Sequence, residues 1–380
     1  MHYPPMPSPA SPPVSNRPAI AQINHSHLLH NYALLKVQAD SADIMAVVKA
    51  NAYGHGMESI AATLSHAGCT HFAVTDASEG LALRQHLDMQ HASDQGASSL
   101  HNIEITLLSG LFSSDDAAFA CNAALTPIIT EPRHINWLQS AHFHGHVWIK
   151  IDSGMNRMGA ADPATLLTQC REAEINVCGL MSHLSCADEP EHPMNRLQLE
   201  TFSQHCEEID PALPRSLLNS AGMMIMPEHA MHTVRPGIAL YGIEPVKGKT
   251  LGLKPVMSLL GSIMQLRDIP AGAAVSYGAT FIAPKPMRLA TVSLGYADGV
   301  PRGLSGIGSV CINGEACPII GRICMDYTMV DVSHIDCALG DFVEFWGEQH
   351  PANSVASQLD TISYTLFTGV GARVQRVNGI

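Results

Sequence analysis

The chain has 380 residues, 46% of them hydrophobic, which is enough for two packed domains or for one large barrel with an appendage. Its 34 acidic and 21 basic residues give a net charge of −13, which disfavours binding to nucleic-acid backbones and to anionic membranes. No run approaches the roughly eighteen uncharged apolar residues of a membrane-spanning helix. The composition therefore favours a small-molecule partner, with no nucleic acid and no membrane.

The N-terminal segment, residues 1–17, is rich in proline and has neither a basic head nor an apolar core of the kind found in signal peptides. We expect it to be a disordered leader on a cytoplasmic protein. The ten cysteines are spread along the chain without a CxxC pair, so we expect them to be buried, reduced thiols.

After the leader, short apolar runs alternate with helix-length segments of period 3.6, a pattern typical of parallel strands covered by helices. Eight runs are candidate strands: 44–48, 71–75, 103–108, 125–129, 147–152, 177–183, 216–219 and 233–241. Candidate helices between them include 59–67, 163–173 and 193–209. Eight such units predict an α/β TIM barrel over residues 18–245. A doubly wound open sheet is the runner-up, but it would need fewer strands or a nucleotide-binding fingerprint that the sequence lacks.

Two groups of closely spaced histidines could suggest a metal site. No carboxylate or cysteine at ligand spacing completes either group, so we expect polar segments and no bound metal. The groups are His25, His27 and His30, and His142, His144 and His146.

Beyond Gly242 the pattern changes to β-rich segments separated by Gly, Pro and Asp, with little helical period. These segments are 257–266, 289–294, 309–312, 327–332 and 342–346. They predict a second, mostly β domain over residues 246–380.

Lys49 stands at the end of the apolar run 44–48 and is followed by a Gly-rich loop. The carboxyl ends of the strands are where barrel enzymes build their active sites. A lysine at such a place is either a surface charge or a desolvated amine held for Schiff-base chemistry, because burial lowers its pKa and leaves a nucleophile.

The string VVKANAYGHG, residues 47–56, closely resembles the pyridoxal phosphate (PLP) lysine signature of alanine racemases, and the resemblance covers the chain from about residue 18 onward. Further matching segments are KIDSGMNRMG (150–159), SHLSCAD (182–188), NSAG (219–222), VRPGIALYG (234–242), VSYG (275–278), GYADG (295–299), GRICMD (321–326) and ISY (362–364). Each is short, but together and in this order they are specific. The resemblance implies a PLP-dependent alanine racemase.

A racemase removes the α-proton from one face of its substrate and returns a proton to the other face, so it needs two acid/base groups. The resemblance assigns these roles to Lys49, for the D-enantiomer, and Tyr277, for the L-enantiomer. A tyrosine has an ordinary pKa near 10, which positive neighbours must lower before it acts as a base near neutrality. In the family this tyrosine comes from the β domain of the partner subunit, which implies a homodimer with shared active sites.

Arg235 lies in the eighth candidate strand, and the resemblance places it against the pyridine nitrogen of PLP. Arginine can only donate hydrogen bonds, so that nitrogen should stay unprotonated and side reactions such as transamination are disfavoured. The resemblance also implies that Asn219 is a cofactor-binding residue, and Asn219 in addition suits the N-cap of a short helix. The other cofactor-binding residues that the resemblance implies are Tyr53, His183, Ser220, Gly237, Ile238 and Tyr364.

Arg157 suits a substrate carboxylate through charge-assisted hydrogen bonds, and the resemblance adds the backbone amide of Met325 from the partner chain. Lys150 matches a lysine that is carbamylated in some members and that buttresses Arg157; Asp326 is a second supporting residue. The family also has a polar corridor that restricts passage to small amino acids. Its counterparts are Asp188, Tyr296, Arg302, Arg322 and Ile362.

Three other functions compete with this one. A PLP decarboxylase for basic amino acids would place an acidic residue where Arg235 stands, and a PLP-homeostasis protein would lack the second domain with Tyr277 and Met325. A racemase of broader specificity, for example towards serine, stays open because a small pocket discriminates weakly between a methyl group and a hydroxyl. The physiological role, D-alanine supply for peptidoglycan or alanine catabolism, also stays open.

Overall fold

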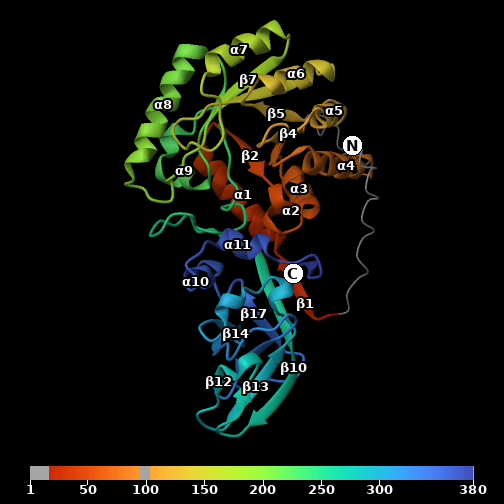
Figure 1. The fold of residues 1–380 in the computed structure, drawn as a ribbon, viewed down its shortest axis with the longest axis vertical. Coiled ribbons are helices and arrows are strands. Elements are labelled where there is room, and N and C mark those ends of the chain that lie inside the picture. The colour runs from red at the N-terminus through yellow and green to blue at the C-terminus, as the bar shows by residue number, and fades with distance from the viewer. Residues whose placement is uncertain (1–16, 94–102, 380) are drawn as a thin grey trace. The chain divides into compact units, whose positions relative to one another are not determined.

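The computed structural model describes residues 17–93 and 103–379, which divide into two compact units (Figure 1). Of the described residues, 25–93 and 103–254 form the barrel unit, and 17–24 and 255–379 form the β unit.

The barrel unit contains one sheet of eight parallel strands in the order β8-β7-β6-β5-β4-β3-β2-β9. Its strands are β2 Asp43–Val47, β3 His71–Val74, β4 Glu104–Leu107, β5 Thr126–Ile129, β6 His146–Lys150, β7 Asn176–Met181, β8 Arg215–Ser216 and β9 Thr233–Val234. Beyond β8 and β9, a parallel bridge joins Asn219 to Arg235, whose amide donates to the Leu218 carbonyl at 2.9 Å. The predicted TIM barrel is therefore confirmed.

Helices cover the outside of this sheet (Figure 1). Proline occupies an N-terminal position of α6, α7 and α8, where its missing N–H group leaves no helical bond unmade. Of the expected helices, 193–209 is confirmed as α8, 163–173 ends one residue earlier as α7, and 59–67 corresponds to α3, which begins two residues earlier. The helices are α1 His25–Ala39, α2 Lys49–Tyr53, α3 Met57–His66, α4 Ala77–Ser93, α5 Ser114–Asn122, α6 Pro132–Ser140, α7 Pro163–Glu172, α8 Pro193–Ile209 and α9 Ser220–Ile225, followed by the 3₁₀ turn η1 Pro227–His229.

The eighth strand was predicted too long, since β9 ends at Val234 and not at residue 241. Pro236 has no N–H group to continue a ladder, and the next residues turn, with the Leu240 amide donating to the Gly237 carbonyl at 2.9 Å. Leu240 is fully buried, so hydropathy alone could not distinguish this turn from a strand.

The β unit is built on an eight-stranded sheet in which β15-β14-β17-β10-β1-β18 follow one another and β13 joins β10 to β16. The strands of this sheet are β1 Ala19–Ile23, β10 Met257–Ile269, β13 Met287–Val292, β14 Ser309–Ile312, β15 Glu315–Pro318, β16 Thr328–Asp331, β17 Phe342–Trp346 and β18 Gln375–Asn378. A separate two-stranded sheet pairs β11 Ala274–Val275 with β12 Phe281–Ile282. The short helices are α10 Ala352–Ser357 and α11 Ser363–Thr368, with 3₁₀ turns η2 Tyr277–Ala279, η3 Tyr296–Asp298 and η4 Arg302–Leu304. The predicted mostly β domain is confirmed.

Strand β1 belongs to the β unit, although we expected residues from 18 onward to enter the barrel. It pairs with β10 on one side, antiparallel, and with β18 on the other, parallel. Both partners are more than 230 residues away in sequence, so no local pattern reveals the pairing. Arg17, expected in the leader, donates to the Asp298 carboxylate at 3.1 Å and to the Ser293 carbonyl at 2.8 Å. The rest of the predicted leader, residues 1–16, lies outside the described residues.

The ten cysteines all fall in the described part of the chain and carry free thiols. Six are buried, as predicted, but Cys121 is exposed. Across residues 17–93 and 103–379, no helix has the length and apolar character needed to cross a membrane, and no three His, Cys, Asp or Glu side chains are placed to hold a metal ion. Of the closely spaced histidines, His142 and His144 lie in the loop between α6 and β6.

Candidate active site

Four cationic side chains gather at the carboxyl ends of the barrel strands. Lys49 follows β2 after one residue, Lys150 is the last residue of β6, Arg157 lies in the loop after β6, and Arg235 directly follows β9. Arg157 lowers the pKa of both lysines, and Lys49 and Arg235 lower that of Lys150, so the four charges share one site. The structure thus groups four residues that are far apart in sequence.

Both lysines are partly or fully withdrawn from water. Lys150 is only 9% exposed, and burial, followed by the neighbouring cations, lowers its pKa to about 8. Burial is also the main cause that lowers the pKa of Lys49. Within the described residues, neither amine and no nitrogen of Arg157 makes a hydrogen bond or ion pair with another side chain. Positive charge without matching carboxylates suits an anionic ligand.

Arg235 is buried in a cage of oxygen acceptors. Its guanidinium donates to the Ser216 hydroxyl, to the Ser182 carbonyl and to the Leu217 carbonyl, the last at 3.1 Å. Burial lowers the pKa of Arg235 to about 10, so it remains charged at neutral pH. Arginine has five N–H donors, so two of them, on Nε and Nη1, have no acceptor among the described residues and can serve a ligand.

His183 follows β7 by two residues and is neutral. Burial, then Arg235 and Arg157, hold its pKa well below the usual range of histidine. Gln198 on α8 donates to the His183 carbonyl at 2.9 Å and so fixes the backbone at this point. The imidazole can therefore both accept and donate one hydrogen bond within the site.

A cradle of hydroxyls and amides forms where residues 237–239 pass Ser220. The Ser220 hydroxyl accepts the amides of Gly237 at 2.9 Å and Ala239 at 3.3 Å. A Cβ atom on Gly237 would lie 2.5 Å from the Tyr53 hydroxyl, so only glycine fits there. Three of the predicted cofactor-binding residues, Tyr53, Ser220 and Gly237, thus lie together. Amides and hydroxyls are the partners that phosphate oxygens prefer.

Two further predicted residues flank this cradle. Asn219 is the N-cap of α9, and its side chain accepts the Gly222 amide at 2.9 Å, which confirms its expected capping role. Ile238 is 1% exposed and is buried within the turn.

The segment after Lys49 is strained. Ala50, Asn51, Ala52 and Tyr53 have φ angles of 52° to 55°, which is a left-handed turn without a single glycine. Such a conformation costs about 1–2 kcal/mol per residue for L-amino acids. Backbone strain of this kind concentrates at functional sites.

Sequence reasoning missed Tyr241, which is fully buried under the site. Its hydroxyl donates to the Val47 carbonyl at 2.9 Å, and its ring lies 4.4 Å from that of His55 and 4.9 Å from that of Tyr53. A polar aromatic at the end of an apolar run was the available signal. Sequence reasoning also missed the two serines that accept hydrogen bonds from Arg235, Ser182 through its carbonyl and Ser216 through its hydroxyl. Nothing in the sequence distinguishes them from other buried serines.

The predicted residues of the β unit lie on neighbouring loops. Tyr277 and Met325 are 70% and 51% exposed. A Cβ atom on Gly278 would lie 3.2 Å from an Arg322 nitrogen, so the Tyr277 turn packs on Arg322. The Tyr296 amide donates to the Cys324 carbonyl at 3.0 Å, which joins the Tyr296 turn to the same loop.

A charged network holds the loop that carries Met325. Arg373 donates to Asp298 at 2.7 Å, to Asp326 at 2.8 Å and to the Met325 carbonyl at 3.3 Å. Arg17 bonds to Asp298 and to the Asp326 carbonyl. The supporting role predicted for Asp326 fits this network, whereas Arg17 and Arg373 were missed.

The positions of the remaining predicted residues do not test their roles. Tyr364 is half-buried in α11, Arg302 begins η4, and Ile362 is 58% exposed ahead of α11. Asp188 is exposed in the loop after β7. Their roles stay predictions.

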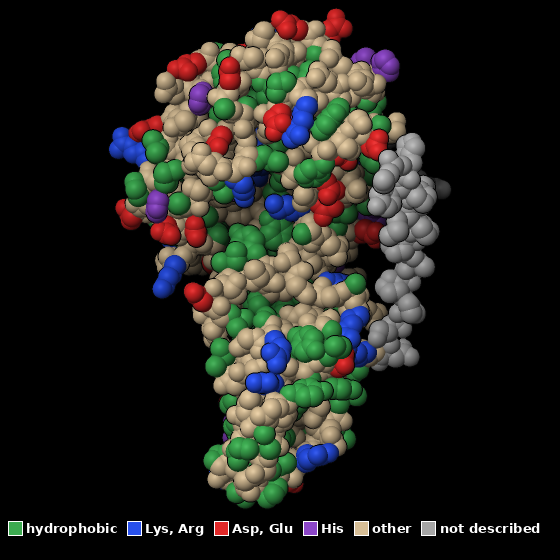
Figure 2. Space-filling model, in the orientation of Figure 1, with side chains coloured by type: hydrophobic (Ala, Val, Ile, Leu, Met, Phe, Trp, Pro, Cys, Tyr) green, Lys and Arg blue, Asp and Glu red, His purple; other side chains and the backbone are tan. Residues whose placement is uncertain are grey.

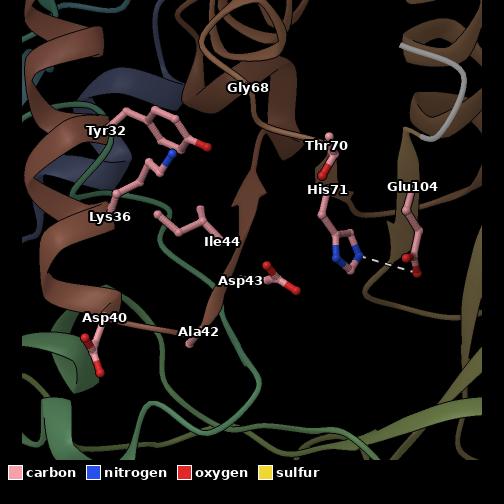
Figure 3. Close-up of a pocket in the computed structure, with 10 residues that line it drawn as sticks. All are labelled: Tyr32, Lys36, Asp40, Ala42, Asp43, Ile44, Gly68, Thr70, His71 and Glu104. Atoms are coloured by element: carbon pink, nitrogen blue, oxygen red, sulfur yellow. Dashed lines mark ion pairs between the residues drawn. The ribbon is translucent and has the colours of Figure 1, made fainter. Parts of the chain in front are cut away.

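A separate cavity of about 250 Å³ lies at the opposite ends of β2, β3 and β4 (Figure 3). His71, at the start of β3, bonds the Thr106 hydroxyl at 2.9 Å and lies 3.5 Å from the Glu104 carboxylate. Burial lowers the pKa of His71, so it carries no charge at neutral pH. The amino ends of barrel strands serve stability and not catalysis, so we place the site at the other end.

The fold and the cationic site define a class: barrel enzymes with a β unit, whose strand ends bind an anionic small molecule. A family model described as the alanine racemase N-terminal domain matches residues 23–245, and one described as the alanine racemase C-terminal domain matches residues 256–378. The chain belongs to the alanine racemase family.

Similar proteins agree with this assignment. The alanine racemase of Stutzerimonas stutzeri (strain A1501) is 38% identical over 371 residues, which is 95% of this chain and 99% of that protein. The crystal structure of biosynthetic alanine racemase from Pseudomonas aeruginosa has a TM-score of 0.84 at 37% identity and covers 96% of this chain and 100% of that one. The alanine racemase from Bartonella henselae, solved with covalently bound pyridoxal phosphate, has a TM-score of 0.83 at 32% identity and covers 95% of this chain and 99% of that one.

Proposed function

We propose that this protein interconverts L-alanine and D-alanine, that Lys49 holds PLP covalently, and that two copies of the chain share the active sites. The observation that carries the proposal is the group of four cations at the carboxyl ends of the barrel strands, in which Lys49 follows β2 and both Lys150 and Arg235 are buried. Family membership and the relative with covalently bound PLP support the same conclusion.

The residues present fit PLP. In the cradle of Ser220, Gly237 and Tyr53, the Ser220 hydroxyl accepts the Gly237 amide and keeps its own proton to donate to a phosphate oxygen. Arg235 has two donors that no described residue uses, which suits the unprotonated pyridine nitrogen. Bound PLP supplies the electron sink that makes an α-proton of an amino acid removable.

The protein groups carry out binding and proton movement. Burial lowers the pKa of Lys49, so a larger share of its amine is neutral and able to accept a proton at Nζ. Tyr277 would exchange a proton at its hydroxyl on the opposite face. Arg157, which is exposed and without a carboxylate partner in the described ranges, would bind the substrate carboxylate with help from the Met325 amide.

Exposed apolar side chains support a dimer. On the face of the β unit that Figure 2 shows, hydrophobic side chains reach the surface in several places. Tyr277, Tyr296, Met325 and Tyr327 are all more than 40% exposed, and they lie on loops that pack together. Exposed apolar patches of this kind mark interaction sites. We propose that a second copy of this chain covers them.

The cellular role is part of the same proposal. The net charge of −13 opposes binding to nucleic acid, and we place the enzyme in the cytoplasm. We favour supply of D-alanine for peptidoglycan over catabolism, since a relative with 38% identity is described as biosynthetic. We also propose that the PLP-binding domain ends at residue 245 and that the β domain comprises residues 246–380, joined by β1, which pairs with β10 and β18 and therefore does not belong to the predicted 18–245 barrel domain.

Circular dichroism of alanine enantiomers tests the activity. Incubation of the purified holoenzyme with either enantiomer should bring the signal to zero, and serine should respond more slowly. An unchanged alanine signal with cofactor bound would contradict racemisation.

Two experiments test the site. Borohydride reduction of the holoenzyme, followed by peptide mapping, should place the cofactor on Lys49. Mixing inactive Lys49→Ala and Tyr277→Phe subunits should restore activity, because one of the two hybrid sites then contains both residues. Activity that stays absent after subunit exchange, or a label on another lysine, would reject the shared site.

A further inference from the structure

A carboxylate in the first turn of α4 joins the ends of two barrel strands. One oxygen of Glu79 accepts the Ala50 amide at 2.7 Å, and the other accepts the Thr75 amide at 2.9 Å. Ala50 directly follows Lys49, and Thr75 directly follows β3. The Glu79 side chain therefore connects the lysine segment after β2 to the neighbouring strand.

Glu79 also affects the charge of the lysine. Burial and Arg157 lower the pKa of Lys49, and Glu79 is the carboxylate that raises it. Because four cations gather at this site, the negative charge of Glu79 offsets part of their effect on Lys49, as Asp152 does for Lys150.

We propose that Glu79 is a positioning residue for Lys49: its two oxygens anchor the strained turn at its first residue and so fix the lysine against β3. This inference rests on the proposed role of Lys49. Two backbone amides donate to two different oxygens, so glutamine, with one acceptor oxygen and an NH₂ group, leaves one amide without a partner. Aspartate keeps the charge, but its side chain is one methylene shorter, so its carboxylate does not reach the two amides.

The test compares Glu79→Gln, Glu79→Asp and a control, Asp88→Asn, in which an exposed acid on the same helix is neutralised. The holoenzymes are assayed from D-alanine and from L-alanine across pH. Borohydride labelling, the visible absorbance of the bound cofactor against pH, and melting temperature are followed beside activity.

For Glu79→Gln we expect kcat to fall about 10- to 100-fold, the loss associated with a small misplacement of a reacting group. From D-alanine, the acid limb of kcat should move to lower pH by up to about one unit, because Lys49 loses its neighbouring negative charge. From L-alanine, where Tyr277 is the proposed base, the acid limb should stay in place. The cofactor absorbance should show the same shift without turnover.

Glu79→Asp should lower kcat without the shift in pH, since the charge is kept, and Asp88→Asn should behave as wild type. A lower melting temperature in both Glu79 variants, with wild-type kcat and pH profiles, would overturn the inference. A wild-type label on a lysine other than Lys49 would instead overturn the proposed function on which it rests.

Discussion

At the scale of single residues, the site makes both of its lysine amines easier to deprotonate than a lysine in water. Burial is the largest cause that lowers the pKa of Lys49 and of Lys150, and the neighbouring Arg157 lowers both further. The same grouping that suits a phosphate and a carboxylate therefore also prepares Lys49 to act as a base.

Lys150 makes the stability of the protein depend on pH. Its folded pKa of about 8 lies below its ordinary value of 10.5, so between these values the unfolded chain binds more protons. The free energy of unfolding should rise through this window, by up to about 3 kcal/mol from this group alone, and the contribution is lost as pH falls through 8. Chemical denaturation at pH 8 and pH 10 should show a smaller rise for Lys150→Met.

Lys247→Met provides the matched control, because Lys247 is exposed. Its pH dependence should equal that of wild type. If the free energy of unfolding rose equally with pH in wild type, Lys150→Met and Lys247→Met, Lys150 would have an ordinary pKa in the folded state.

Sequence reasoning identified the charged residues of the site but not the residues that position them. Lys49 and Arg235 stand in segments that resemble the family, whereas Glu79 and Arg373 act through backbone groups distant in sequence. Such contacts depend on the tertiary fold, which no local pattern encodes.

At the scale of elements, the left-handed turn 50–53 should reverse the usual loss of stability on substitution of a residue by glycine. Ala50→Gly should leave stability unchanged or raise it by up to about 1 kcal/mol, because glycine adopts positive φ without strain. Ala82, exposed in the right-handed helix α4, is the control, and Ala82→Gly should lose about 1 kcal/mol. Equal losses in chemical denaturation would show that the turn is not strained.

The close contact of Gly237 with Tyr53 predicts a specific coupling. Gly237→Ala should weaken PLP binding about 10-fold or more, because its Cβ atom would lie 2.5 Å from the Tyr53 hydroxyl. In a Tyr53→Phe background the same change should do less harm, since the hydroxyl is gone and the next contact, with Cζ, is at 3.1 Å. Cofactor titration of wild type, the two single variants and the double variant measures this coupling. Strictly additive changes in the free energy of PLP binding would refute the contact.

The fold was predicted best where one signal dominates. Runs 309–312 and 342–346 match β14 and β17, and 193–209 matches α8, because apolar run length or helical period is unambiguous there. The turn after β9 was missed because buried turn residues and buried strand residues have the same hydropathy. The pairing of β1 was missed because its partners are distant in sequence.

At the scale of the whole molecule, assembly should depend on the exposed aromatics of the β unit. Tyr327 is 46% exposed and has no proposed catalytic role, so Tyr327→Glu should weaken the dimer without altering the site chemistry directly. Analytical ultracentrifugation should show a larger monomer fraction, with activity that recovers at high protein concentration. Phe119→Glu, at a 40% exposed phenylalanine on α5, should remain as wild type, and an unchanged sedimentation profile for Tyr327→Glu would remove this surface from the interface.

The pairing of β1 between β10 and β18 has a consequence for biosynthesis. All residues of the barrel unit are translated before Pro255, so the barrel unit can emerge from the ribosome and fold while the β unit is still being made. Strand β1, in contrast, is made before the barrel unit, and its partners β10 and β18 are made after it. Pairing of residues so far apart in sequence is slow, so the sheet of the β unit should be completed only after β18 has been synthesised.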